Sequence, residues 1–176
     1  MSYMKVFASF FVSIGLILFP SSVLAEKEDP SSKYKVLSTE NSSLNISTIN
    51  TFLEQAEVSI NIGNIEDAIG KLKNARNASN LLINYYKDLN NSFLGIDALI
   101  PRELAKKNQN VIQLLAKANM QLATIYRSNG QPELSVPLLV EIVKKLSPVN
   151  PSGAKAYQQL IELGLVDTPF GGAPKQ

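Results

Sequence analysis

The amino-acid sequence predicts an all-α protein. Apolar residues recur at steps of three and four through most of residues 47–163, which is the spacing of one helix face. We find no segment with the alternating apolar and polar residues that are typical of a half-buried strand. Gly63, Gly130 and Gly164 each follow a periodic segment, where glycine commonly ends a helix in the left-handed conformation. These observations predict about five helices joined by short turns.

Residues 1–25 precede the periodic region and have the features of a signal peptide. Lys5 supplies an early positive charge, residues 6–20 are uncharged and largely apolar, and Val23 and Ala25 occupy the cleavage positions. We therefore expect an exported protein that is cleaved after Ala25. An uncleaved N-terminal anchor is the alternative, although the apolar run is shorter than the ~20 residues of a membrane span.

The next segment, residues 26–46, is polar and has no clear period, so we interpret it as a flexible leader. The helical domain is expected over residues 47–166. Ser47 is a suitable N-cap for its first helix, which ends at Gly63. Asn64 is a suitable N-cap for a second helix that reaches about Leu89. The apolar face of the first helix is formed by Ile49, Leu53, Ala56 and Ile60.

A long third helix is expected from Pro101 to about Asn129, because proline suits the first turn of a helix. Its apolar residues follow a heptad: Leu104, Val111, Leu115, Ala118, Leu122 and Ile125. A fourth helix begins at Pro132 and contains Pro137, where we expect a kink. The last helix spans residues 151–163, with Ala154, Tyr157, Leu160 and Ile161 on its apolar face. Residues 167–176 are expected to be disordered.

The composition of the chain excludes most catalytic chemistry. The 176 residues include no His, Cys or Trp, so thiol nucleophiles, imidazole bases, disulfides and the common zinc sites are absent. We expect no cofactor and no metal. Cleavage after Ala25 removes one Lys and no acid, which leaves 16 basic and 15 acidic residues. This balance argues against nucleic acid as a partner, because such proteins usually carry a clear basic excess.

Two turn glycines indicate an internal repeat. Gly63 and Gly130 are 67 positions apart, close to twice the period of about 34 residues of the tetratricopeptide repeat. The segments around them resemble this helix–turn–helix repeat, with small residues where two helices must approach closely. The resemblance is carried by Phe52, Ala56, Gly63, Ala68, Leu72 and Ala75 in one unit and by Leu122, Ala123, Tyr126 and Gly130 in the other.

The chain departs from the tetratricopeptide pattern at several positions. Ser59 stands where the repeat has tyrosine, Ile142 is larger than the usual alanine, and tryptophan is absent. Residues 82–114 do not form a convincing third repeat. The resemblance implies a tetratricopeptide-like array in which the last helix, residues 151–163, acts as a C-terminal cap. An irregular helical bundle whose spacing arises by chance is the alternative.

The resemblance also implies a function. In this family the first helices of the repeats line a groove that holds a peptide or helix of a protein partner. Carried over to this chain, the groove side shows Asn50, Leu53, Glu57 and Asn61 from one unit and Lys117, Met120, Thr124 and Arg127 from the other. The expected contact residues among them are Asn61, Lys117, Met120, Thr124 and Arg127. Lys117, Arg127 and Asn61 would hold a carboxylate, and Met120 would give an adaptable apolar contact. The alternative is that these residues form ordinary solvated helix surface.

We therefore expect an exported protein–protein interaction module, a scaffold or assembly factor, and not an enzyme. The remaining candidates for catalysis are carboxylates at helix starts and exposed positions: Glu66, Asp67, Glu133, Glu141, Glu162 and Asp167. The alternative function is a permanent helical subunit of a larger membrane-associated complex. Contact with a membrane is expected only through an uncleaved signal or through a partner complex.

The expected destination is the periplasm or the thylakoid lumen. Export follows from the signal peptide. Residues 131–170 are similar to small exported proteins of cyanobacteria. That similarity adds the thylakoid lumen to the destinations and the assembly of photosynthetic complexes to the roles.

Overall fold

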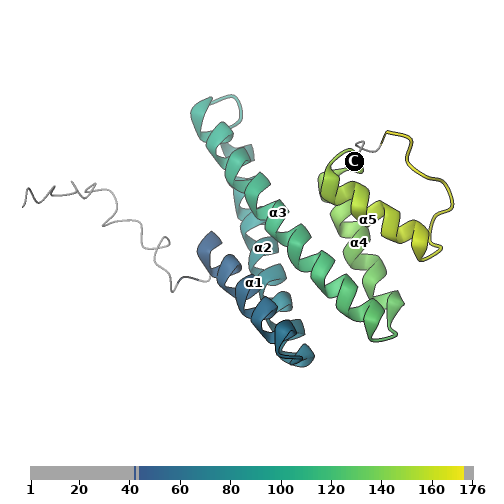
Figure 1. Cartoon of the computed structure of the whole chain (residues 1–176). Helices are drawn as coiled ribbons and strands as arrows, with labels where there is room; N and C mark the ends of the chain where they lie inside the picture. Colours follow the sequence, from purple (N-terminus) through teal and green to yellow (C-terminus); the bar gives the residue numbers. More distant parts are fainter. Residues whose placement is uncertain (1–41, 43, 173–176) are drawn as a thin grey trace, which may run out of the picture. The chain divides into compact units, whose positions relative to one another are not determined.

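The computed structural model describes residue 42 and residues 44–172, and these form five helices and no strand (Figure 1). The predicted all-α class is therefore confirmed. The helices are α1 (Ile46–Asn61), α2 (Ile65–Phe93), α3 (Leu99–Ser128), α4 (Pro132–Leu146) and α5 (Pro151–Glu162). Each helix packs mainly on the next one in the sequence, so they form an array. The predicted signal peptide, nearly all of the predicted leader and residues 173–176 lie outside the described residues.

Asparagine side chains cap three of the helices. The Asn45 side chain accepts a hydrogen bond from the backbone N–H of Ser47 at 3.0 Å, so α1 begins one residue before Ser47, the predicted cap. Asn64 caps α2 as expected and accepts from the N–H of Asp67 at 3.3 Å. Asn150 caps α5 in the same way. These bonds satisfy backbone donors that have no partner within the helix.

The turns at the predicted glycines have the expected backbone. Gly63, Gly130 and Gly164 have φ angles of 77°, 72° and 73°, which is the left-handed region where a side chain would be strained. The turns after α1 and α3 are therefore built in the same way. Pro137 lies inside α4, as expected.

The middle of the chain is a long hairpin. The second helix continues past Leu89 to Phe93, and the third starts at Leu99, two residues before Pro101. Figure 1 shows the turn between α2 and α3 lying beyond the end of α1. The segment that lacks a clear third repeat in the sequence is therefore two continuous helices.

The core runs along the array between consecutive helices. Apolar residues with at most 2% of their surface exposed are Ile49, Leu53, Ala56, Ala68, Leu72, Ala75, Val111, Leu115, Ala118, Leu122, Ala123, Leu139, Ile142 and Ala156. Of the predicted packing residues, Phe52 and Tyr126 are partly buried against this core, and the two turn glycines are exposed. Among the described residues, no helix combines the length and the apolar character needed to cross a membrane.

The packed face of α5 differs from the prediction. Gly153, Ala156 and Leu160 are its buried residues, whereas Ala154, Tyr157 and Ile161 are only half-buried. The Tyr157 hydroxyl donates a hydrogen bond of 2.8 Å to the carbonyl of Thr168, and its ring meets Phe170 edge-on. The described part of the predicted tail, 167–172, contains no helix and lies against α5 through these contacts.

Candidate protein-binding groove

Four of the five predicted groove residues lie on one side of α3. Lys117, Met120, Thr124 and Arg127 follow one another at steps of three, four and three, which places them on adjacent turns of one helix face. Asn61 is exposed at the last position of α1. The structure therefore brings the α3 residues together, but among the described residues no hydrogen bond or ion pair joins Asn61 to them.

Lys117 is paired with an acidic residue of α1. Its ammonium nitrogen lies 2.7 Å from Oε1 of Glu57, and the amide of Gln121 donates to the same oxygen at 3.2 Å. The hydrogen bond and the positive charge of Lys117 lower the pKa of Glu57. About half of each charged side chain is exposed, so the pair is accessible to a competing carboxylate.

Arg127 is paired with an acidic residue of α5. Its Nη2 lies 3.2 Å from Oε2 of Glu162, which is the last residue of α5. The Met120 sulfur accepts from the amide of Gln159 on α5 at 3.2 Å, and Thr124 donates to the Met120 carbonyl at 2.9 Å. The α3 face is therefore held between α1 and α5, and both predicted cations already have internal partners.

A shallow cleft of about 260 Å³ lies where α3 meets the start of α5. Its walls are Gln113, Ala116, Lys117, Met120, Gln121, Ser152 and Lys155. It contains two predicted residues, Lys117 and Met120, but not Asn61, Thr124 or Arg127. The predicted combination of Lys117, Arg127 and Asn61 around one carboxylate is not formed.

Lys155 is a cleft residue that the sequence does not single out. It belongs to α5, which is predicted only as a cap and not as a wall of a groove. Lys155 is exposed and forms no ion pair with any residue that the structure describes. The cleft thus contains one free ammonium group and one that is shared with Glu57, next to the soft apolar surface of Met120.

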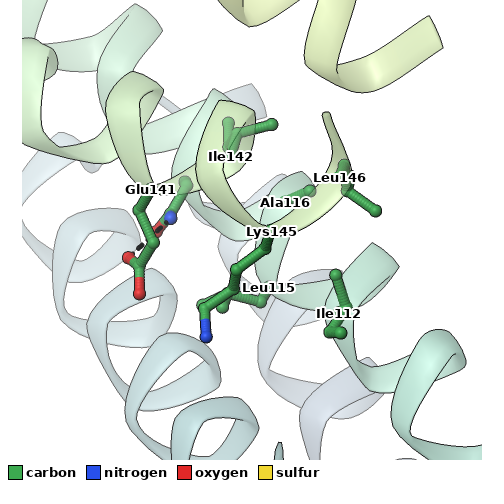
Figure 2. Close-up of a pocket in the computed structure, with 8 residues that line it drawn as sticks. Ile112, Leu115, Ala116, Glu141, Ile142, Lys145 and Leu146 are labelled. Atoms are coloured by element: carbon green, nitrogen blue, oxygen red, sulfur yellow. Dashed lines mark hydrogen bonds between the residues drawn. The ribbon is translucent and has the colours of Figure 1, made fainter. Parts of the chain in front are cut away.

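A second polar cluster lies on the other side of α3, in the pocket of Figure 2. The guanidinium of Arg76 on α2 donates to Oε2 of Glu141 on α4 at 2.9 Å, and the amide of Asn119 donates to the same oxygen at 2.9 Å. Burial raises the pKa of Glu141, but the bonds from Asn119 and Arg76 and the charges of Arg76 and Lys145 outweigh it, so this pKa is lowered. The pocket is too small to hold a water molecule, so it is not a ligand site. The role of the cluster is structural, because its hydrogen bonds join α2, α3 and α4.

The sequence does not single out Asn119, because the heptad of apolar residues on α3 does not include it. It is fully buried, on a helix whose other buried residues are mostly Leu, Val, Ile and Ala. The signal in the sequence is an asparagine within a helix of mostly apolar buried positions and a glutamate 22 positions further on. Its acceptor, Glu141, is identified in the sequence only as an isolated acid.

Two of the other predicted carboxylates are explained by their place at the start of a helix. Glu66 and Asp67 lie in the first turn of α2, where the helix dipole favours negative charge. Asp67 also accepts a hydrogen bond of 2.5 Å from the hydroxyl of Ser59. In the described part of the chain, no group of three or more acidic side chains is arranged to hold a metal ion.

Comparisons of the chain with models of protein families, with curated proteins and with solved structures find no significant match. The function is therefore inferred from this chain's own residues and their arrangement.

Proposed function

We propose that the protein is an exported scaffold that binds an acidic peptide or helix of a protein partner in a tetratricopeptide-like groove. The groove is formed by α1, the C-terminal half of α3 and α5. The observation that carries the proposal is the cleft in which Lys117, Met120 and Lys155 meet. Its expected location is the periplasm or the thylakoid lumen, in keeping with the signal-like residues 1–25.

The arrangement of the helices supports the tetratricopeptide-like part of the proposal. α1 with α2, and α3 with α4, each form a helix–turn–helix pair around a left-handed glycine, and the two glycines are 67 positions apart. Small buried residues stand at the equivalent positions, Ala56 with Ala123 and Ala68 with Ser135. Such residues allow close approach of paired helices, which the repeat requires.

The charges of the cleft define the ligand chemistry. Lys155 is available for a carboxylate, and Lys117 can exchange its bond to Glu57 for one to the ligand, because that pair is half-exposed. An ion pair at an exposed site of this kind contributes about 0.2–1 kcal/mol, because water screens the charges. Met120 adds apolar contact that adapts to different side chains. An acidic segment with an apolar residue beside its carboxylate fits this surface.

The test is affinity capture with the tagged full chain from its native membrane and periplasmic extracts. The wild type is compared with Lys117→Glu/Lys155→Glu in the cleft and with the matched control Lys71→Glu/Lys73→Glu on α2. We expect a defined partner that the wild type and the control retain and that the cleft variant loses. In the variant Glu57→Gln, Lys117 no longer has its internal competitor, so we expect capture to increase.

Thermal unfolding of each variant shows that a loss of capture is not a loss of folding. The single variant Lys155→Glu leaves the Lys117–Glu57 pair intact and is the safeguard if the double variant is unstable. Capture of the same partners by the wild type and the cleft variant would exclude the groove.

The second candidate is a permanent subunit of a membrane-associated complex. It is favoured by one observation: Leu81, Tyr85 and Leu89 of α2 follow one another at steps of four and are each 40–50% exposed. An apolar stripe of this kind is typical of a permanent interface. Size measurement separates the two functions, because a scaffold purifies as a soluble monomer and a permanent subunit purifies with its complex.

A further inference from the structure

A second exposed surface lies far from the groove, at the turn between α2 and α3. Leu94, Ile96 and Leu99 form this surface, which we name the apolar tip, and 61%, 78% and 73% of their surfaces are exposed. Residues 89–101 contain a single charged residue, Asp97. Figure 1 shows the turn beyond the end of α1, so this helix does not cover it.

Several polar groups of the turn have internal partners. The Asp97 carboxylate accepts hydrogen bonds from the backbone N–H groups of Leu99 at 2.7 Å and Ile100 at 2.8 Å. It also lies at the N-terminus of α3, where the helix dipole favours a negative charge. The N–H groups of Ile96 and Asp97 both donate to the carbonyl of Phe93. The turn can therefore leave water at a smaller penalty than a turn with free polar groups.

Positive charges follow the apolar tip along α3. At a rise of ~1.5 Å per residue, Arg102 and Lys106 lie about 5 and 10 Å along the helix axis from Leu99. Neither forms an ion pair with another described residue, whereas the neighbouring Lys107 is paired with Glu103 at 2.6 Å. Two unpaired cations thus stand just behind an apolar end.

We propose that the apolar tip inserts into the interfacial layer of an anionic lipid bilayer. Interfacial segments bury their apolar side chains about 5–10 Å deep and keep their cations at the level of the headgroups. The positions of Leu94, Ile96 and Leu99 relative to Arg102 and Lys106 match that profile in depth and in charge. A convex end with exposed aliphatic side chains suits a fluid layer better than a preformed protein groove. This role is independent of the groove and extends beyond the proposed partner binding.

The experiment uses the absence of cysteine in the full chain. Ile96→Cys is labelled with the environment-sensitive fluorophore nitrobenzoxadiazole and mixed with vesicles of phosphatidylcholine and phosphatidylglycerol. We expect a blue shift of the emission and quenching by nitroxide-labelled lipids. The matched control is Ile62→Cys at the turn after α1, where the wild-type side chain is 72% exposed. Because the probe reports its own surroundings, insertion of residues 6–20 does not produce the signal at position 96.

Two sets of substitutions in the labelled chain test the two parts of the surface. Leu94→Ser/Leu99→Ser should raise the lipid concentration that gives half of the maximal emission shift by at least about tenfold. The reason is that the variant no longer gains the free energy of moving two aliphatic side chains from water into the bilayer. Arg102→Gln/Lys106→Gln should raise it about tenfold for vesicles with phosphatidylglycerol and leave it unchanged for phosphatidylcholine alone. Lys71→Gln/Lys73→Gln, on the distant part of α2, should change neither value.

The remaining outcomes overturn the proposal. Emission at position 96 that does not change with vesicles shows that the tip stays in water. Equal shifts at positions 62 and 96 show general adsorption or unfolding instead of insertion of the tip. A shift that appears without lipid and grows with protein concentration assigns the surface to a second copy of the chain. Failure of the partner capture leaves these signals unaffected, so the two proposals are separable.

Discussion

Glu141 shows how one residue can hold three helices together. It accepts hydrogen bonds from Arg76 of α2 and Asn119 of α3 while it belongs to α4. Asn119 is fully buried, and without the carboxylate its amide would keep only the long hydrogen bond of 3.4 Å to the carbonyl of Leu138. A buried donor that loses its partner costs about 1–3 kcal/mol. A polar residue that is buried among mostly apolar neighbours is therefore explained by its contact with this carboxylate.

We predict that Glu141→Gln lowers the free energy of unfolding by about 1–2 kcal/mol at neutral pH, because Arg76 loses its countercharge. Urea unfolding measures this change, with the exposed Glu54→Gln as the control. The folded-state pKa of Glu141 lies below its usual value of 4.5, so the stabilisation is present above that pH and is lost as the pH falls through the folded pKa. The wild type should therefore lose more stability than Glu141→Gln on acidification below pH 4.5. Parallel acid profiles would contradict this role.

At the scale of elements, helix α5 packs closely because one of its residues has no side chain. Gly153 is buried, and a Cβ atom placed there would lie 2.7 Å from the carbonyl carbon of Ser147. Ser147 has a φ angle of 61°, which turns the chain sharply between α4 and α5. The position of α5, which also forms one wall of the cleft, thus depends on a backbone-to-backbone contact.

We predict opposite effects for two Gly→Ala substitutions in helices. Alanine in place of an exposed helical glycine usually stabilises by about 1 kcal/mol, and Gly70→Ala should do so because no atom lies within 4 Å of the new Cβ. Gly153→Ala should destabilise by about 1–3 kcal/mol, since the backbone of the turn must move. Urea unfolding of both variants decides the point, and stabilisation by Gly153→Ala would rule out the close approach.

At the scale of the whole described chain, three ion pairs join helices that are not neighbours in sequence. Glu57 with Lys117 joins α1 to α3, Arg76 with Glu141 joins α2 to α4, and Arg127 with Glu162 joins α3 to α5. All three lie in the part of the array that contains the core. The outer halves of α2 and α3 have few buried residues, with Leu104 as the last one on the α3 side. Stability should therefore be unevenly distributed.

We predict that backbone amides in residues 88–103 exchange with deuterium faster than those in residues 111–125. The first set belongs to a pair of helix ends with little burial, and the second to the centre of the core. Hydrogen exchange followed by mass spectrometry of the full chain measures both segments in one sample. Equal protection would mean that the hairpin end is covered in solution. Vesicles should slow exchange in residues 88–103 if the apolar tip inserts.

Much of the fold follows from local patterns. The predicted turns at Gly63 and Gly130 are correct, and Ala68 and Leu72 are buried as their spacing indicates. The exact helix lengths are less well predicted. Asp97 accepts bonds from two N–H groups at the start of α3, so this helix begins earlier than Pro101 alone indicates.

The candidate site is only partly predictable from the sequence. The spacing correctly places Lys117, Met120, Thr124 and Arg127 on one face of α3, because helix geometry is a property of a single segment. It cannot reveal that Glu57 and Glu162 neutralise two of these cations, since that depends on which faces of α1 and α5 meet α3.

The sequence by itself determined the helical class, the left-handed glycine turns and most of the buried apolar positions. Each of these follows from interactions within a turn or two of the chain, where caps, dipoles and helical period act. Only the tertiary structure decided the pairing of charges, the cleft with Lys155, the cluster around Asn119 and the exposure of the apolar tip. These features arise from the rotation and contact of helices far apart in sequence, and side-chain spacing in one helix carries no information about its neighbour's orientation.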